Sequence, residues 1–103
     1  MDYCSTGDSE KVVTAAEAVL EGISEEGELI VPTKLPAISN QELLQFANLN
    51  YIQRAHRILS LFLTDFTDEE LNYCISQAYS NSFEENMPAL ITSLSNGRHL
   101  LEL

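Results

Sequence analysis

The sequence predicts an α+β fold that is mostly helical, with about four helices, a few short strands and a C-terminal β-hairpin. Three observations support this class. Thr14–Glu17, Ser39–Glu42 and Thr67–Glu70 each place Ser or Thr three positions before Glu, which is the capping-box pattern that begins a helix. Residues 51–63 carry apolar side chains at helical spacing, and Asn96-Gly97 separates two apolar runs. The 103 residues, 45% of them hydrophobic, are expected to form a single domain over 1–103.

The segment 51–63, YIQRAHRILSLFL, has the clearest helical pattern in the chain. Tyr51, Ala55, Ile58 and Phe62 recur along one side of a helix, whereas most polar residues fall on the other side. The pattern favours a central core helix, on which the shorter elements pack, over a partner-binding groove or a membrane face.

The N-terminal third is expected to alternate strands and a helix. Residues 2–6 have weak strand character, and residues 7–11 read as a polar loop. Thr14 and Glu17 form a capping box that begins a helix, and Gly22 ends it because glycine tolerates a positive φ. The apolar side chains expected to face inward are Ala16, Val19 and Leu20.

A turn at Glu25–Gly27 is predicted to lead into a short strand over 29–31, with Pro32 at its end. The chain should then stay extended to Pro36, since residues before proline avoid the α region.

Two further capping boxes predict helices at Ser39–Glu42 and at Thr67–Glu70. The first helix should end near Ala47 and the second near Tyr79. The residues expected to be buried are Leu43, Leu44 and Phe46 in the first, and Leu71, Cys74, Ile75 and Ala78 in the second.

The C-terminal part should hold the hairpin. Residues 80–85 read as a turn, and Met87-Pro88 prevents a continuous helix. Residues 91–94 and 98–103 are predicted to pair as strands around Ser95–Gly97, because Asn-Gly favours a tight turn.

The charge excludes some classes of partner. Sixteen acidic residues against five Lys and Arg give a formal net charge of −11. Nucleic acids and anionic membrane surfaces select clusters of Lys and Arg, so neither is expected as a partner. The N-terminus lacks the apolar region of a signal peptide, which predicts a cytoplasmic protein. Cys4 and Cys74 fit no paired motif and are expected to be free thiols.

No pattern of reactive residues predicts a catalytic, cofactor-binding or metal-binding site. The single residues considered are more consistent with structural roles: His56 on the central helix, His99 as a solvent-facing strand residue, and the acids around Gly27 as a turn. Neither Lys11 nor Lys34 lies in an apolar stretch that would suit a Schiff-base lysine. The residues alone therefore leave open an alternative function, that of a stand-alone small acidic protein-interaction domain.

Five segments in order resemble the N-terminal part of threonine synthases. Tyr3–Thr6 is similar to the family's Y-x-S-T start, and Glu17–Gly22 to its E-A-[VL]-L-x-G-L helix end. Glu28–Pro32, followed by Leu35-Pro36, resembles G-L-[YF]-V-P…[IL]-P. Tyr51–Leu63 resembles Y-x-x-[RL]-A-x-x-[IV]-L-S-x-F, and Leu101–Leu103 resembles the L-E-L that precedes F-H-G-P-T-x-A-F-K-D. The order and spacing are more specific than any one segment.

The resemblance implies a non-catalytic, structural N-terminal domain of a larger enzyme. Threonine synthase uses pyridoxal 5'-phosphate to convert O-phospho-L-homoserine and water to L-threonine and phosphate. The cofactor lysine of the family lies in F-K-D, beyond Leu103, so no catalytic or cofactor residue maps onto this chain. We therefore expect a truncated form that is inactive alone and whose partners are the catalytic domains of the same polypeptide.

Two positions depart from the family pattern. Gly7 stands where the family has Arg, and Glu28 stands at the second glycine of its D-G-G-L turn. A threonine-synthase-like phospholyase with altered substrate preference is therefore an alternative parent.

The apolar C-terminal strand is the candidate docking element. Its side chains would lack their cover in the isolated chain, which could then self-associate through this strand. The candidate domain-docking residues are Leu100, Leu101 and Leu103.

Overall fold

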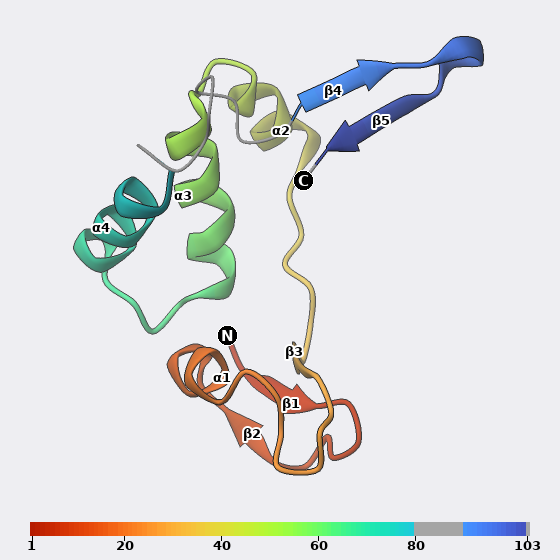
Figure 1. Ribbon diagram of the computed structural model, residues 1–103. Helices are drawn as coiled ribbons and strands as arrows, with labels where there is room; N and C mark the ends of the chain where they lie inside the picture. The colour runs from red at the N-terminus through yellow and green to blue at the C-terminus, as the bar shows by residue number, and fades with distance from the viewer. Residues whose placement is uncertain (80–89, 103) are drawn as a thin grey trace.

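The computed structural model describes residues 1–79 and 90–102, and its elements confirm the predicted α+β class (Figure 1). Four α-helices and two small antiparallel sheets lie in these ranges. In chain order the elements are β1 Tyr3–Ser5, β2 Val12–Val13, α1 Ala15–Glu21, β3 Ile30–Pro32, α2 Asn40–Phe46, α3 Tyr51–Phe62, α4 Asp68–Tyr79, β4 Leu90–Ser93 and β5 His99–Glu102.

The N-terminal sheet has the strand order β2-β1-β3, with β1 antiparallel to both neighbours. Tyr3 lies opposite Val13 on one side and Pro32 on the other. The strand predicted at 2–6 is confirmed, and so is the one predicted at 29–31, which runs from Ile30 to Pro32 with the proline at its end. Strand β2 has no signal in the sequence, because two residues are too few to show a period.

The three predicted capping boxes are confirmed and begin α1, α2 and α4. A fourth box, which the sequence analysis missed, begins α3: Asn50 Oδ1 accepts from the Gln53 amide at 2.9 Å, and Gln53 Oε1 accepts from the Asn50 amide at 3.0 Å. Gly22 ends α1 with φ +68°, as predicted. Local side-chain bonding therefore sets where each helix begins.

The pair α3 and α4 forms the main helical contact of the described chain. Leu71 and Ile75 of α4 are 3% and 2% exposed. The rings of Tyr51 and Tyr79 meet edge to face, with centroids 5.0 Å apart at 75°. The start of α3 therefore lies beside the end of α4, and the two helices run antiparallel. Arg54 also joins α3 to α2, since its Nε donates to the Phe46 carbonyl at 2.8 Å.

The buried core is smaller than the sequence predicted. Val19 and Leu20 were expected to face inward but are 64% and 86% exposed, because no described element covers that side of α1. The predicted burial of Leu43 and Leu44 is wrong for the same reason.

In α4, Cys74 and Ala78 are exposed, while the predicted burial of Leu71 and Ile75 is confirmed. The stripe of α3 is only partly covered, and none of its residues is fully buried.

The hairpin β4–β5 is confirmed, with Ile91 opposite Leu101 and Thr92 opposite Leu100. Asn96 and Gly97 both have positive φ, at 61° and 68°. The Leu94 amide donates to the Arg98 carbonyl at 2.8 Å and closes the turn. The predictions for 80–85, Met87-Pro88 and Leu103 lie outside the described residues.

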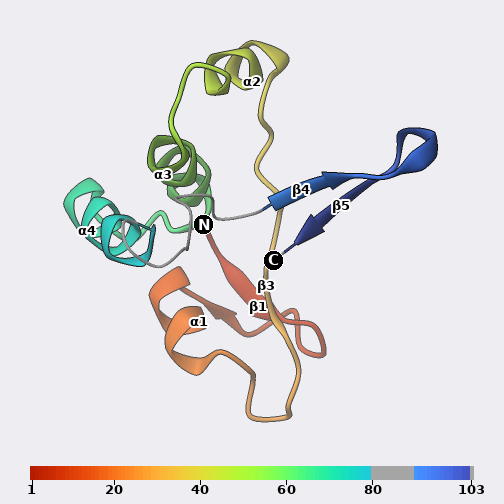
Figure 2. The ribbon, with the colours of Figure 1, turned by 45° about the horizontal axis from the view of Figure 1, so that its top comes forward.

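The elements are loosely arranged (Figures 1 and 2). The sheet with α1 lies at one end, an extended segment at 33–39 leads to the three other helices, and the hairpin projects away from them. The radius of gyration is 16.5 Å, against about 13 Å for a compact domain of this length. The accessible surface is 8047 Å², against about 5,800 Å² for a compact monomer of this mass. The prediction of one single domain over 1–103 stays a prediction.

Candidate functional site

The scattered polar residues do not converge on one place. Cys4 is buried in β1 and Cys74 is exposed on α4, and both are free thiols, as predicted. His56 is half-buried on α3, with Nε2 3.6 Å from Asp68 Oδ1. His99 is exposed on the hairpin, as predicted, and its Nδ1 lies 3.3 Å from Ser93 Oγ. Within 1–79 and 90–102, no three His, Cys, Asp or Glu side chains are placed to hold a metal ion.

The acidic turn around Gly27 is tied to the N-terminal strand. The turn is closed by the Ser24 amide, which donates to the Glu28 carbonyl at 2.9 Å, and Gly27 has φ +84°. Ser5 Oγ donates to Glu28 Oε2 at 2.7 Å. The Glu28 carboxylate lies over Gly7, so a Cβ at position 7 would overlap it. The two positions that depart from the family pattern are therefore neighbours in space.

The surroundings of Lys11 do not fit pyridoxal phosphate, the cofactor that the family resemblance implies. Lys11 borders a hollow of about 40 Å³ together with Asp8, Glu21 and Glu26. Pockets that enclose small ligands measure about 300–1,000 Å³. The three carboxylates would also repel the phosphate dianion. No step of cofactor chemistry is therefore assigned to this lysine.

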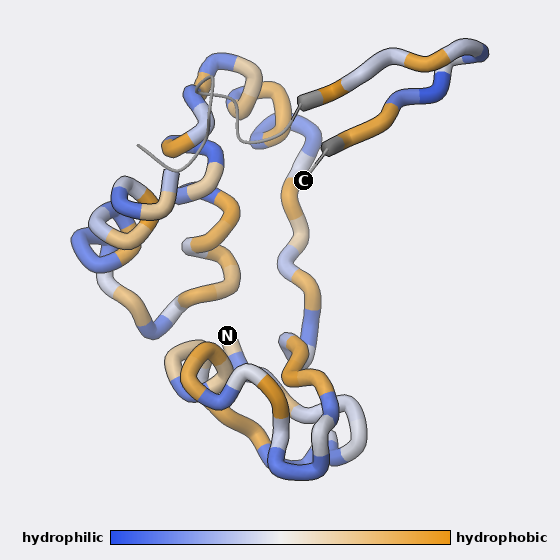
Figure 3. Tube along the Cα trace, in the orientation of Figure 1, coloured by the Kyte–Doolittle hydropathy of each residue, from blue (hydrophilic) through white to orange (hydrophobic). Residues whose placement is uncertain are grey.

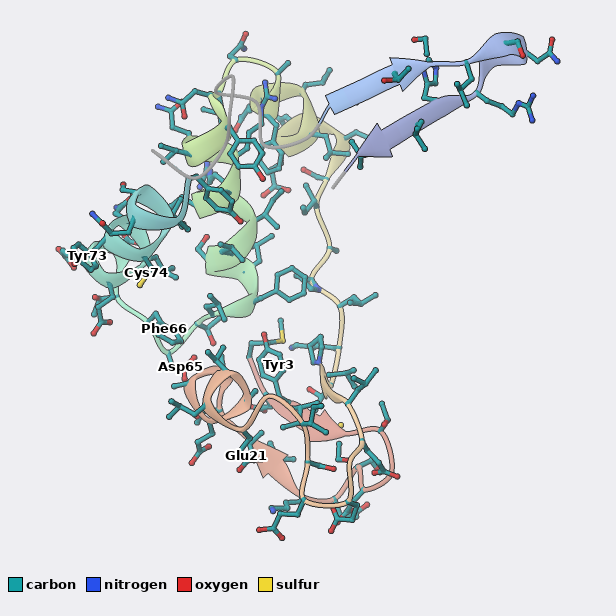
Figure 4. All side chains as sticks on the ribbon, in the orientation of Figure 1. Tyr3, Glu21, Asp65, Phe66, Tyr73 and Cys74 are labelled. Carbon is teal, nitrogen blue, oxygen red and sulfur yellow. The ribbon has the colours of Figure 1, made fainter. Side chains whose placement is uncertain are left out.

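Three hydrogen bonds join the N-terminal sheet and α1 to the residues at and just after the end of α3. Figure 4 shows Tyr3 and Asp65 at this junction. The Tyr3 hydroxyl donates to the Phe62 carbonyl at 3.1 Å. The Ala16 amide, in the first turn of α1, donates to Asp65 Oδ2 at 2.9 Å, and the N-terminal amino group bonds Thr64. Burial, followed by the nearby Asp65 carboxylate, raises the pKa of Tyr3 above its usual value. The junction is structural, because its polar groups are used to hold the two parts together.

Apolar residues occur in every part of the described chain (Figure 3), and many of their side chains are exposed. Leu20 is 86% exposed, Leu35 79% and Leu44 74%. Leu100 and Leu101, two of the three candidate docking residues, are about half exposed, and Leu103 lies outside the described residues. Large apolar side chains gathered on a surface mark places where another body binds. The group near the end of α1 comprises Val19, Leu20, Ile23 and Leu29; the group around α2 comprises Leu35, Leu43 and Leu44; the hairpin carries Ile91, Leu94, Leu100 and Leu101.

The described helices include none that is both long and apolar enough to span a bilayer.

Comparison with known proteins gives a consistent result. The family model described as "Threonine synthase N terminus" matches residues 2–79. A threonine synthase of Schizosaccharomyces pombe is 26% identical over 100% of this chain, and one of Eremothecium gossypii is 30% identical over 98%. The human protein "Threonine synthase-like 1" is 32% identical over 93%. The crystal structure of threonine synthase from Escherichia coli superposes on 93% of the chain with a TM-score of 0.77 and 25% identity.

The chain spans only a small part of these relatives. It covers 20% of the S. pombe protein, 21% of the E. gossypii protein, 14% of the human protein and 21% of the E. coli chain.

Proposed function

Because this chain belongs to the family of threonine synthase N-terminal domains, we propose that it is a structural, non-catalytic part of a threonine synthase. The complete enzyme would convert O-phospho-L-homoserine and water to L-threonine and phosphate with pyridoxal 5'-phosphate. The observation that supports this most strongly is that the S. pombe threonine synthase aligns with the whole chain. The chain covers only a fifth of that protein.

The exposed apolar surface supports a structural role. The accessible surface of 8047 Å² exceeds that of a compact monomer by about 2,000 Å². This excess is comparable with the area that a large, stable interface buries in total. We assign the missing cover to the catalytic domains of the same polypeptide, with Leu100, Leu101 and Leu103 among the docking residues.

Three finer statements belong to the same proposal. The complete enzyme acts in the cytoplasm. The 103-residue chain alone is inactive, which is supported by the small, acid-lined hollow beside Lys11. At high concentration the isolated chain self-associates through its uncovered apolar side chains, which sedimentation velocity would reveal as mass above that of the 11.5 kDa monomer.

The coding sequence provides the most economical test. Reading about thirty codons past Leu103 should reveal a segment like G-P-T-x-x-F-K-D, which carries the family's cofactor lysine. A stop codon directly after Leu103 would contradict the proposal and favour a stand-alone interaction domain. A complete polypeptide that binds the cofactor but makes no threonine would instead favour a threonine-synthase-like phospholyase.

A further inference from the structure

The hairpin β4–β5 carries apolar side chains on both of its faces. Directly opposed residues share a face, and neighbours along a strand alternate. Ile91 and Leu101 therefore lie on one face, whereas Leu100, opposite Thr92, lies on the other. Leu94, two residues after Thr92, shares the face of Leu100. A hairpin packed on a core by one side would instead alternate apolar and polar residues.

Neither face of the hairpin is covered by the described chain. Ile91 is 63% exposed, Leu94 50%, Leu100 49% and Leu101 51%. The two strands contact each other, but they make no extensive contact with any other described helix or strand. In both views the hairpin projects away from the helices (Figures 1 and 2). An isolated two-stranded hairpin is at best marginally stable in water, so this one requires cover.

The family match separates the hairpin from the rest of the chain. The N-terminal family model ends at residue 79, and the hairpin begins at Leu90. Yet the threonine synthases of S. pombe and E. gossypii align over 100% and 98% of the chain, so the hairpin lies within the region that they share with it. The hairpin is therefore part of the sequence shared with threonine synthases, but it lies outside the residues that the N-terminal family model matches.

A second copy of the chain would not provide the cover required. Two hairpins that pair edge to edge extend the sheet but leave both faces open, and face-to-face packing covers only one. Strands with adjacent apolar residues, such as Leu100-Leu101, are typical of sheets that are covered on both sides. A larger body with a layer on each side of the hairpin meets this need.

On the basis of the proposed function, we infer that β4–β5 is the first hairpin of the catalytic body rather than part of the body formed by residues 2–79. Its strands join a sheet of the same polypeptide, and both of its faces become buried there. The boundary between the two bodies then falls between Tyr79 and Leu90.

Amide hydrogen exchange, measured by mass spectrometry at low micromolar concentration, tests the separation of the hairpin. In the 103-residue chain, the hairpin amides should exchange about 100-fold faster than the amides of β1 and β3. In the complete polypeptide the same amides should become protected by about 100-fold, independently of protein concentration. Equal protection of hairpin and β1 in the 103-residue chain would overturn the inference. In the complete polypeptide, hairpin protection that rises with protein concentration would also overturn it, because it would identify a second copy as the cover.

Two charge substitutions in the complete polypeptide test the two faces. Leu100→Lys and Leu101→Lys should each lower the Tm by several degrees, since each places a charge in a buried layer. The control Ser95→Lys, in the exposed turn, should leave the Tm unchanged. If only one of the two leucine substitutions lowers the Tm, only one face is covered and the inference fails.

Neither readout depends on catalysis, so the two proposals can fail separately. A complete polypeptide that makes no threonine but loses stability with both substitutions contradicts the proposed function alone. An active threonine synthase that tolerates Leu100→Lys contradicts the hairpin inference alone.

Discussion

The hydroxyl of Tyr3 donates a hydrogen bond to the backbone carbonyl of Phe62 at 3.1 Å, which joins two residues 59 positions apart. Tyr3 lies in the central strand of the N-terminal sheet, and Phe62 is the last residue of α3. Figure 4 shows Tyr3 and Asp65 at the junction between the sheet and the helices. Because three hydrogen bonds cross this junction, we expect its polar contacts to contribute to stability.

Replacing Tyr3 with Phe tests this bond directly. The change removes one hydroxyl and leaves the Phe62 carbonyl without that donor, so the free energy of unfolding should fall by about 1 kcal/mol. Urea denaturation at neutral pH measures the change. The matched control is Tyr73→Phe, at a side chain that is 69% exposed. Equal effects of the two substitutions would show that the hydrogen bond from Tyr3 contributes nothing to the free energy of unfolding.

Asp65 holds the same junction through a second contact and also acts on Tyr3. Its carboxylate accepts from the Ala16 amide at 2.9 Å, where the positive end of α1 favours an acid. Asp65→Asn keeps an oxygen that can accept from the Ala16 amide but removes the negative charge, so it should lower the free energy of unfolding by about 0.5 kcal/mol.

The same substitution should move the Tyr3 pKa downward, but not fully to its ordinary value, because burial is the larger cause of its rise. The raised pKa means that the neutral Tyr3 stabilises the fold below pH 10, and that this contribution is lost as the pH rises through the folded pKa. Absorbance titration of tyrosinate measures the Tyr3 pKa in the parent and in Asp65→Asn, when the titration curve of the matching Tyr3→Phe variant is subtracted from each. An unchanged Tyr3 pKa in Asp65→Asn would contradict the described proximity.

The three Thr/Ser-Glu capping boxes predict a loss of stability in acid. Backbone and side-chain hydrogen bonds from Thr14 lower the pKa of Glu17 below its usual 4.5, and Thr67 does the same for Glu70. The Ser39 hydroxyl, followed by its amide, lowers the pKa of Glu42. Since the folded pKa values are depressed, this stabilisation is present above pH 4.5 and is lost as the pH falls through them.

Thermal unfolding followed by circular dichroism from pH 6 downward measures this dependence. The triple variant Glu17→Gln, Glu42→Gln, Glu70→Gln should be less stable at pH 6 and should lose less stability on acidification than the parent. A matched triple variant at acids without a helix-capping role, Glu10, Glu21 and Glu25, should keep the parent's pH dependence. The same flattening in both variants would assign the effect to net charge instead of capping.

Gly7 and Glu28 should be coupled. A Cβ at position 7 would displace the Glu28 carboxylate and so break its 2.7 Å bond with Ser5. Gly7→Ala should therefore lower the free energy of unfolding by about 1 kcal/mol.

In the Glu28→Ala background the same Gly7 substitution should be close to neutral, because nothing remains to displace. Urea denaturation of the two single variants and the double variant gives the coupling energy. Strictly additive effects would show that the two positions are independent.

Local signals predicted the ends of the elements well. The boxes at Thr14, Ser39 and Thr67 and the turn at Asn96-Gly97 all depend on bonds within a few residues, which the sequence displays directly. The box at Asn50 and Gln53 has the same spacing, with Asn and Gln in place of Ser or Thr and Glu, so the sequence does contain its signal.

Burial could not be predicted in the same way, because it depends on what covers a side chain. Leu20 and Leu44 have the helical spacing of core residues, yet no described element covers them. The contact between Asp65 and the Ala16 amide crosses 49 positions and leaves no local pattern. The apolar character of the hairpin leucines predicts their role as docking residues, and the half-exposed side chains of Leu100 and Leu101 support that proposal.

The most direct test of the central claim is an assay of phosphate and threonine formation from O-phospho-L-homoserine, with pyridoxal 5'-phosphate supplied. The complete polypeptide should release phosphate and threonine in equal amounts, and the 103-residue chain should release neither. Turnover by the 103-residue chain itself, or a complete polypeptide that forms no threonine, would contradict the account.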